Sequence, residues 1–174
     1  MDEIVRAALR KWPNVPHCYG WLALDTRGQW FMRDERIQAA GSFPQVKGSR
    51  IDHPKLLDFI DRNYEHDADG CWFFQNGPQR VYVQLEAAPW IWRLDGGGDS
   101  AQLLSHTGTA ARFDAAWLDE HGRLFASSDR GLGLVHTQDM HLAARAVESG
   151  AWRPQEIGFA ELPQRFGYRL QPGA

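Results

Sequence analysis

The chain has little cysteine: only Cys18 and Cys71 among 174 residues. Their wide separation matches neither a CxxC redox motif nor the spacing of a zinc site. The first residues, Met1 to Lys11, are interrupted by charges and lack the apolar stretch of a signal peptide. We therefore expect two reduced thiols in a cytoplasmic protein.

Long blocks of positive charge and long apolar runs are also missing. The formal net charge is -3, and no block of lysine and arginine of the usual length occurs. This balance argues against nucleic acid or an anionic membrane as the main partner. No run approaches the roughly 18 apolar residues that span a bilayer.

Motifs of known enzymes are absent as well. The sequence contains no GxSxG elbow, no HExxH and no Walker pattern. Asp67-x-Asp69-Gly70 lacks the remaining oxygen ligands of a calcium loop, and Asp58 and Asp61 are expected to be solvated surface charges. We expect no catalytic residues, no metal and no cofactor, and hence a protein that is not an enzyme. A hydrolase of unfamiliar type stays an open alternative, because folding can pair distant residues.

The seven histidines do not form a metal motif. His136 and His141 are five residues apart, which is not the spacing of a zinc helix. The others either stand at expected turns and element ends, where solvated or capping histidines are common, or lack a neighbouring third ligand: His17, His53, His66, His106 and His121.

Three turns with the pattern Asp-x-x-Gly are present. They start at Asp25, Asp67 and Asp119, and large apolar residues follow each one. Asp bonds its own turn backbone, and Gly permits the positive φ of a tight reversal. The first and third predict β-hairpins, and the second predicts a turn from a helix into a strand.

The spacing of apolar residues predicts the remaining helices and strands. Helices are expected at 4–12, 35–40, 52–64 and from 137 to 150. Strands are expected at 21–24, 29–32, 71–75, 81–85, 90–94, 101–105, 112–118, 122–127, 131–135 and 167–170, with a hairpin at Asn76-Gly77 and a flexible turn at 95–98. This order predicts an α+β protein: a small mixed module over residues 1–86, followed by a β-rich, barrel-like module over residues 87–174.

The order of these motifs resembles a family of uncharacterised bacterial proteins, found mainly in proteobacteria. The likeness is carried by Asp25-x-x-Gly28-x-Trp30-Phe31, Gly48-Ser49-x-Ile51, Asp69-Gly70-x-Trp72, Val81-Tyr82-Val83 and Glu86-Ala87-Ala88-Pro89-Trp90. It spans roughly residues 20–136, and this chain departs by an extra segment at 34–47. The resemblance implies two small α+β modules, the second like a pleckstrin-homology barrel, and supplies no catalytic residues.

The eight tryptophans allow two interpretations. Five fall on expected strands: Trp30, Trp72, Trp90, Trp92 and Trp117. If several share a concave face, they bind an apolar or planar ligand. If not, they fill the cores of two small modules, which is the interpretation we favour.

A binding or sensing role for a small molecule or peptide is the function we expect. The candidate contacts combine cationic or polar tips with expected surface positions: Lys47, Arg50, His53, Arg80 and Tyr82. Lys47-Gly48-Ser49-Arg50 is a weak candidate for an anion site, against a plain solvated loop. A scaffold that acts through protein contacts, or through homodimers formed by the N-terminal helix face or an exposed strand edge, is the alternative.

Overall fold

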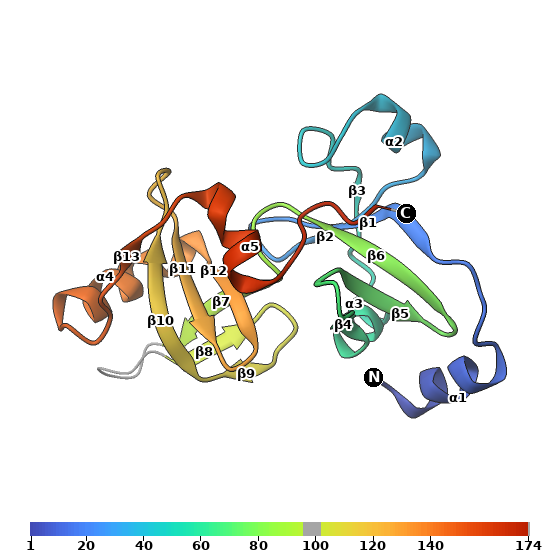
Figure 1. Ribbon diagram of the computed structural model, residues 1–174, viewed down its shortest axis with the longest axis horizontal. Helices are drawn as coiled ribbons and strands as arrows, with labels where there is room; N and C mark the ends of the chain where they lie inside the picture. Colours follow the sequence, from blue (N-terminus) through green and yellow to red (C-terminus); the bar gives the residue numbers. More distant parts are fainter. Residues whose placement is uncertain (96–101, 174) are drawn as a thin grey trace. The chain divides into compact units, whose positions relative to one another are not determined.

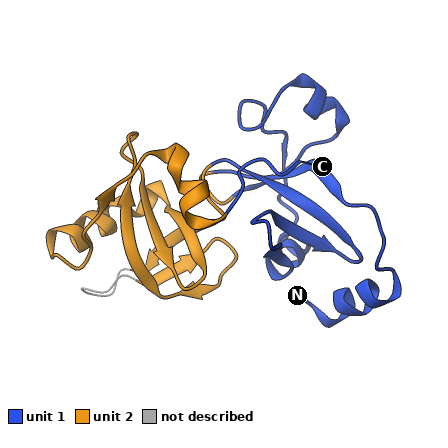
Figure 2. Cartoon of the chain, viewed as in Figure 1, with its two compact units in different colours: residues 1–25, 29–86, 168–174 blue, residues 26–28, 87–167 orange. Residues whose placement is uncertain are grey.

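The computed structural model describes residues 1–95 and 102–173 (Figure 1). The chain divides into two compact units (Figure 2). Unit 1 comprises residues 1–25, 29–86 and 168–174, and unit 2 comprises residues 26–28 and 87–167. The sequence-based boundary between 86 and 87 stays a prediction, and the structure places residues 168–174 with unit 1.

A six-stranded sheet forms unit 1, in the order β3-β2-β1-β6-β5-β4. Neighbouring strands are antiparallel except for β1 and β6, which are parallel. The strands are β1 (Cys18–Leu24), β2 (Trp30–Met32), β3 (Ser49–Arg50), β4 (Tyr64–His66), β5 (Trp72–Asn76) and β6 (Gln79–Leu85).

Three helices accompany this sheet: α1 (Glu3–Lys11), α2 (Glu35–Ala40) and α3 (Pro54–Arg62). Each lies where the sequence predicts it. Pro54 occupies the first turn of α3, where its missing N–H costs nothing. Phe59 of α3 packs edge-to-face on Phe74 of β5, with the ring centroids 5.4 Å apart, so the helix covers the sheet through its apolar side.

The segment at 34–47 is held by a buried arginine. Arg33 is 2% exposed. Its guanidinium donates to the backbone oxygens of Gly41 (2.6 Å) and Val46 (3.2 Å) and to Oε1 of Gln84 on β6 (2.8 Å). Burial lowers the pKa of Arg33. One side chain thus ties both ends of the loop after α2 to the sheet.

Unit 2 is built on a seven-stranded sheet, in the order β13-β10-β11-β12-β7-β8-β9. It curls into a half-barrel (Figure 1). The strands are β7 (Trp90–Asp95), β8 (Gln102–Ser105), β9 (Ala110–Ala111), β10 (Phe113–Leu118), β11 (Leu124–Ser128), β12 (Gly131–Val135) and β13 (Gln155–Glu156). The pairs β7–β12 and β10–β13 are parallel. The expected turn at 95–98 falls largely outside the described residues.

The last third of unit 2 differs from the prediction. The helix α4 (Met140–Glu148) follows the short helix η1 (Thr137–Asp139), as expected. However, the chain then forms β13, η2 (Phe159–Glu161) and α5 (Leu162–Phe166). The strand predicted at 167–170 is wrong: Gly167 ends α5 in the left-handed conformation, and Leu170 accepts one hydrogen bond from Leu85 without extending the sheet.

All three Asp-x-x-Gly turns have the same local geometry. In each, the Asp side chain accepts the N–H of the residue four positions on: Gln29 (2.9 Å), Cys71 (2.9 Å) and Arg123 (2.8 Å). Each turn joins two antiparallel strands. The second turn was predicted to follow a helix directly; instead α3 ends at Arg62, and the buried Tyr64 begins β4.

The tryptophans on the strands belong to the two cores. Trp30, Trp72, Trp90, Trp92 and Trp117 are at most 7% exposed. Trp92 donates its indole N–H to the Ala126 carbonyl (2.9 Å) and lies against Gly133, where any Cβ would collide with the ring. The structure therefore confirms the packing interpretation.

The structure also confirms the α+β class. Within the described residues, the helices lack the length and apolar character needed to cross a membrane.

Candidate functional site

The five residues proposed from the sequence as ligand contacts lie in unit 1, but in different surroundings. Arg50 is exposed on the edge strand β3, and His53 is exposed at the start of α3. Arg80 and Tyr82 lie on β6. Since β2 and β1 stand between β3 and β6, and neighbouring strands are about 4.8 Å apart, Arg50 is separated from Tyr82 by roughly 14 Å.

Lys47 makes two ion pairs inside unit 1. Its Nζ lies 3.1 Å from Oδ2 of Asp25 and 3.1 Å from Oε2 of Glu86. Burial works against its charge, but the hydrogen bonds from Lys47 to Glu86 and Asp25 outweigh this effect and raise the pKa of Lys47. The ammonium thus holds two carboxylates of its own unit.

Tyr82 is likewise engaged within unit 1. Its ring stacks on Tyr19 at a centroid distance of 4.7 Å, and its hydroxyl donates to Oδ2 of Asp67 (3.0 Å). The Arg80 guanidinium lies 4.4 Å from the centre of the Phe73 ring. Arg80 and Tyr82 therefore support the sheet and the Asp67 turn.

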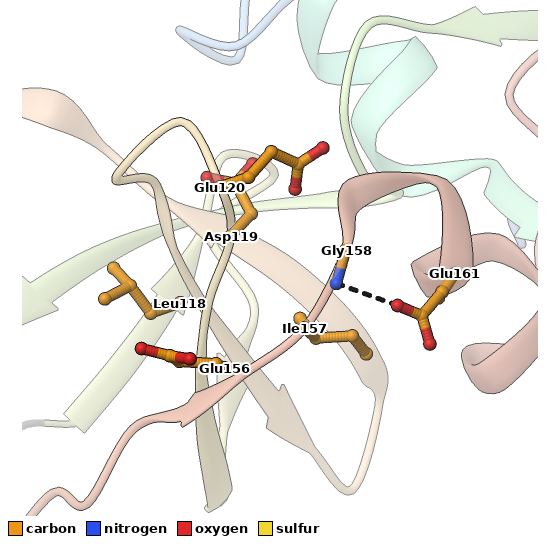
Figure 3. Close-up of a pocket in the computed structure, with 7 residues that line it drawn as sticks. All are labelled: Leu118, Asp119, Glu120, Glu156, Ile157, Gly158 and Glu161. Atoms are coloured by element: carbon orange, nitrogen blue, oxygen red, sulfur yellow. Dashed lines mark hydrogen bonds between the residues drawn. The ribbon is translucent and has the colours of Figure 1, made fainter.

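A pocket of about 440 Å³ lies in unit 2 (Figure 3). Three segments line it: the end of β10 with the turn that follows, the end of β13 with the two residues after it, and the last residue of η2. The lining residues are Leu118, Asp119, Glu120, Glu156, Ile157, Gly158 and Glu161. The pairing of β10 with β13 brings the segments together, and the Ile157 N–H donates to the Leu118 carbonyl (3.0 Å).

Every charged side chain that lines this pocket is a carboxylate. Asp119 is fully buried and is neutralised by Arg123, whose Nε lies 2.7 Å from Oδ2 of Asp119. Arg123 does not line the pocket; its guanidinium lies 4.3 Å from the centre of the Phe159 ring. The charge that is left belongs to Glu120, Glu156 and Glu161.

The three glutamates differ in the hydrogen bonds that their carboxylates accept within unit 2. Oε2 of Glu120 accepts the Phe159 N–H (2.7 Å), and this bond lowers the pKa of Glu120. Oε1 of Glu161 accepts the Gly158 N–H (3.0 Å), which leaves Oε2 for another donor. Glu156 is exposed on β13. Figure 3 shows Glu156 and Glu161 extending in different directions, with Ile157 between them.

This arrangement suits an extended cation better than a metal ion. Within the part of the chain that the structure describes, no three His, Cys, Asp or Glu side chains converge closely enough to hold a metal. The glutamates instead offer several separate acceptors beside the apolar side chains of Leu118 and Ile157. Such a surface fits ammonium or guanidinium groups joined by a hydrocarbon chain.

Two pairs of neighbouring acids are the signal in the sequence for this pocket. Asp119 and Glu120 are adjacent acids in a turn of known type, and Glu156 and Glu161 are two further acids close together. Only the parallel pairing of β10 with β13 brings the two pairs into one pocket. Because β13 has two residues, periodicity could not predict it.

Two groups with displaced pKa values serve the cores. Asp61 was expected to be solvated, yet it is half-buried and accepts the Trp30 indole N–H (3.0 Å). Burial raises the pKa of Asp61 to about 6. His106 was expected at a solvated turn; its Nδ1 accepts the Ile91 N–H (3.2 Å), and burial lowers its pKa to about 3. His136 caps the start of η1, since its Nδ1 accepts the Gln138 N–H (3.1 Å).

Comparison with protein families places the whole chain in one of them. A family model described as "Protein of unknown function (DUF2946)" matches residues 1–173. The chain belongs to this family. The resemblance to a family of unknown function is thereby confirmed at this level. No curated protein matches the chain.

Two solved structures are similar to parts of the chain. One is the crystal structure of a DUF1285 family protein from Silicibacter pomeroyi DSS-3, at 13% identity; the match covers 74% of this chain and 70% of that one, with a TM-score of 0.49. The other is a DUF1285 family protein from Shewanella baltica OS155, at 16% identity, covering 72% and 91%, also with a TM-score of 0.49.

Proposed function

We propose that this protein is a binding protein whose unit 2 holds an extended organic cation. The ligand carries two or more ammonium or guanidinium groups, as a polyamine or a peptide rich in Lys and Arg does. One observation carries the proposal: the pocket of about 440 Å³ is lined by four carboxylates and by no basic side chain.

Charge and shape both support this ligand class. Arg123 neutralises Asp119, so Glu120, Glu156 and Glu161 contribute three negative charges to the pocket. A carboxylate bound by a cationic N–H makes a hydrogen bond about twice as strong as a neutral one. The hydrocarbon part of the ligand would cover Leu118 and Ile157, as the stems of Lys and Arg cover apolar surface in proteins.

The protein binds its ligand and does not transform it, it needs neither metal nor cofactor, and it works in the cytoplasm. A pleckstrin-homology-like barrel is our interpretation of unit 2. Lys47, Arg50, His53, Arg80 and Tyr82 lie outside the pocket of this proposal.

Calorimetric titration at low salt tests the proposal with two probes. Spermidine represents a small polyamine, and a short peptide with three lysines represents a peptide of equal charge. Binding of either probe supports the ligand class. The probe that binds more tightly shows whether the ligand is a polyamine or a basic peptide. Because exposed ion pairs are screened, the affinity should fall as salt is added.

A matched pair of variants locates the binding. Glu156→Gln removes an exposed carboxylate of the pocket, and Glu148→Gln removes an exposed carboxylate of α4 outside it. An exposed ion pair contributes about 0.2–1 kcal/mol, so Glu156→Gln should weaken binding roughly 1.4- to 5-fold. Equal loss in both variants, or no binding of either probe to the wild-type protein, would refute the proposal.

A further inference from the structure

Gly158 stands where any side chain would touch a carboxylate of the pocket in unit 2. A Cβ at this glycine would lie 2.7 Å from Oε1 of Glu161, and its next nearest atoms, Cδ and Cγ of Glu161, are 3.6 Å and 3.7 Å away. The backbone of Gly158 has φ -72° and ψ 135°, a conformation that every residue type adopts. Glycine is therefore not needed here for its conformation. What it supplies is room for the Glu161 carboxylate.

The backbone of Gly158 also binds that carboxylate. Its N–H donates to Oε1 of Glu161 (3.0 Å), along the dashed line in Figure 3. A glutamate at this place in a helix commonly reaches back to the N–H before the first turn, and hydrogen bonds to a charged group are stronger than those between neutral groups. Glu161 is thus held in one main position although its side chain is exposed.

The segment that holds Glu161 is itself fixed on both sides. The Ile157 N–H donates to the Leu118 carbonyl at the end of β10 (3.0 Å). The Phe159 N–H donates to Oε2 of Glu120 (2.7 Å), which anchors a second carboxylate of the pocket on the same segment. A Cβ added between Ile157 and Phe159 would therefore displace the flexible glutamate side chain and leave the backbone in place.

From this geometry, and resting on the proposed function, we infer that Gly158 determines which spacing of cationic groups the pocket accepts. Glu120 and Glu161 are anchored on two consecutive backbone N–H groups, so the separation of their carboxylates is set before the ligand arrives. A ligand whose ammonium groups match this separation binds without rearranging either side chain, and such preorganisation increases affinity. The ligand class thereby narrows to diamines and polyamines of matching chain length.

Calorimetric titration at low salt with α,ω-diamines of three to eight carbons measures this selectivity. Every probe carries two ammonium groups, so the long-range attraction is alike and the spacing is what varies. For the wild-type protein the affinity should peak at one chain length. The best and worst diamines should differ by about 5-fold, the effect of one exposed ion pair made or lost.

A matched pair of glycine substitutions tests the role of Gly158. Gly158→Ala should reduce the difference between diamines to less than about 2-fold, because the Glu161 carboxylate leaves its anchored position while the charge of the pocket stays the same. Gly173→Ala, where a Cβ meets no atom within 4 Å, should keep the wild-type profile. Urea denaturation verifies that both variants fold.

A double variant shows whether Gly158 acts through Glu161. Glu161→Gln removes the charge and should also flatten the profile. Adding Gly158→Ala to Glu161→Gln should then change nothing further, because two changes that act through one carboxylate are not additive. General distortion of the pocket by the alanine would instead weaken binding in both backgrounds.

Failure of this role and failure of the proposed function give different results. Equal affinity of the wild-type protein for every diamine, a Gly158→Ala protein that keeps the wild-type profile, or additive losses in the double variant would overturn the role of Gly158 alone. If no diamine binds the wild-type protein, the proposed function is refuted and the role of Gly158 with it.

Discussion

Replacing Asp61 by Asn should stabilise this protein at neutral and alkaline pH. In the folded chain the Asp61 carboxyl is half-buried against Trp30, and its pKa is raised from 3.8 to about 6. Burial is the main cause, the Trp30 N–H opposes it, and the charge of Asp58 adds to it. Asn keeps an oxygen for the Trp30 N–H and carries no charge, so only the cost of burying the charge is removed.

The magnitude follows from the displacement of the pKa. At about 1.4 kcal/mol for each pH unit, the rise to about 6 corresponds to roughly 3 kcal/mol. The side chain is partly exposed, and solvent screening reduces this value. We expect Asp61→Asn to raise the free energy of unfolding by about 1–2 kcal/mol at pH 8.

The sign of the pH dependence is fixed by proton binding. Between pH 3.8 and about 6 the folded state binds more protons at Asp61 than the unfolded state does. The stability contributed by this group is therefore present at low pH and lost as the pH rises through 6. The difference in the free energy of unfolding between wild type and Asp61→Asn should be about a third as large at pH 4.5 as at pH 8.

Urea denaturation of both proteins at pH 4.5 and pH 8 measures the difference in their free energies of unfolding at each pH. Asp58→Asn is the matched control on the same helix. It removes the exposed charge that adds to the pKa of Asp61 and leaves the buried carboxyl in place, so its effect should have the same sign and a smaller size. An Asp61→Asn protein that is less stable than wild type at pH 8, or a stability difference that is the same at both pH values, would contradict the raised pKa of Asp61.

Three further predictions follow from buried contacts. Gly133→Ala should destabilise unit 2 by about 1–3 kcal/mol, because its Cβ would collide with the Trp92 indole; Gly173→Ala, which meets no atom within 4 Å, is the control in the same urea assay. Arg33→Met should cost about 2–4 kcal/mol and speed hydrogen exchange over 34–47, because it removes three hydrogen bonds. The His106 ring should stay neutral from pH 8 to pH 5 in NMR titration, whereas in urea it should titrate near 6.5; a native midpoint above 5 would contradict this.

Local signals in the sequence were sufficient for much of the secondary structure. An Asp-x-x-Gly turn forms from residues within five positions of each other, so its pattern predicts its geometry. The bounds of α2 and α3, and most strands, follow in the same way from proline, glycine and apolar periodicity. The strand predicted at 167–170 failed because alternation of side chains does not show whether a pairing partner is near.

What the tertiary structure alone decided are the contacts between distant segments. The parallel pairs β1–β6, β7–β12 and β10–β13 join residues far apart in the chain, and the last of them assembles the acidic pocket. Burial of Asp61, His106 and Arg33 also arises from such contacts, although each has the composition of a surface residue. A side chain's own chemistry and its near neighbours determine local geometry, whereas its burial and charge depend on which remote segment packs against it.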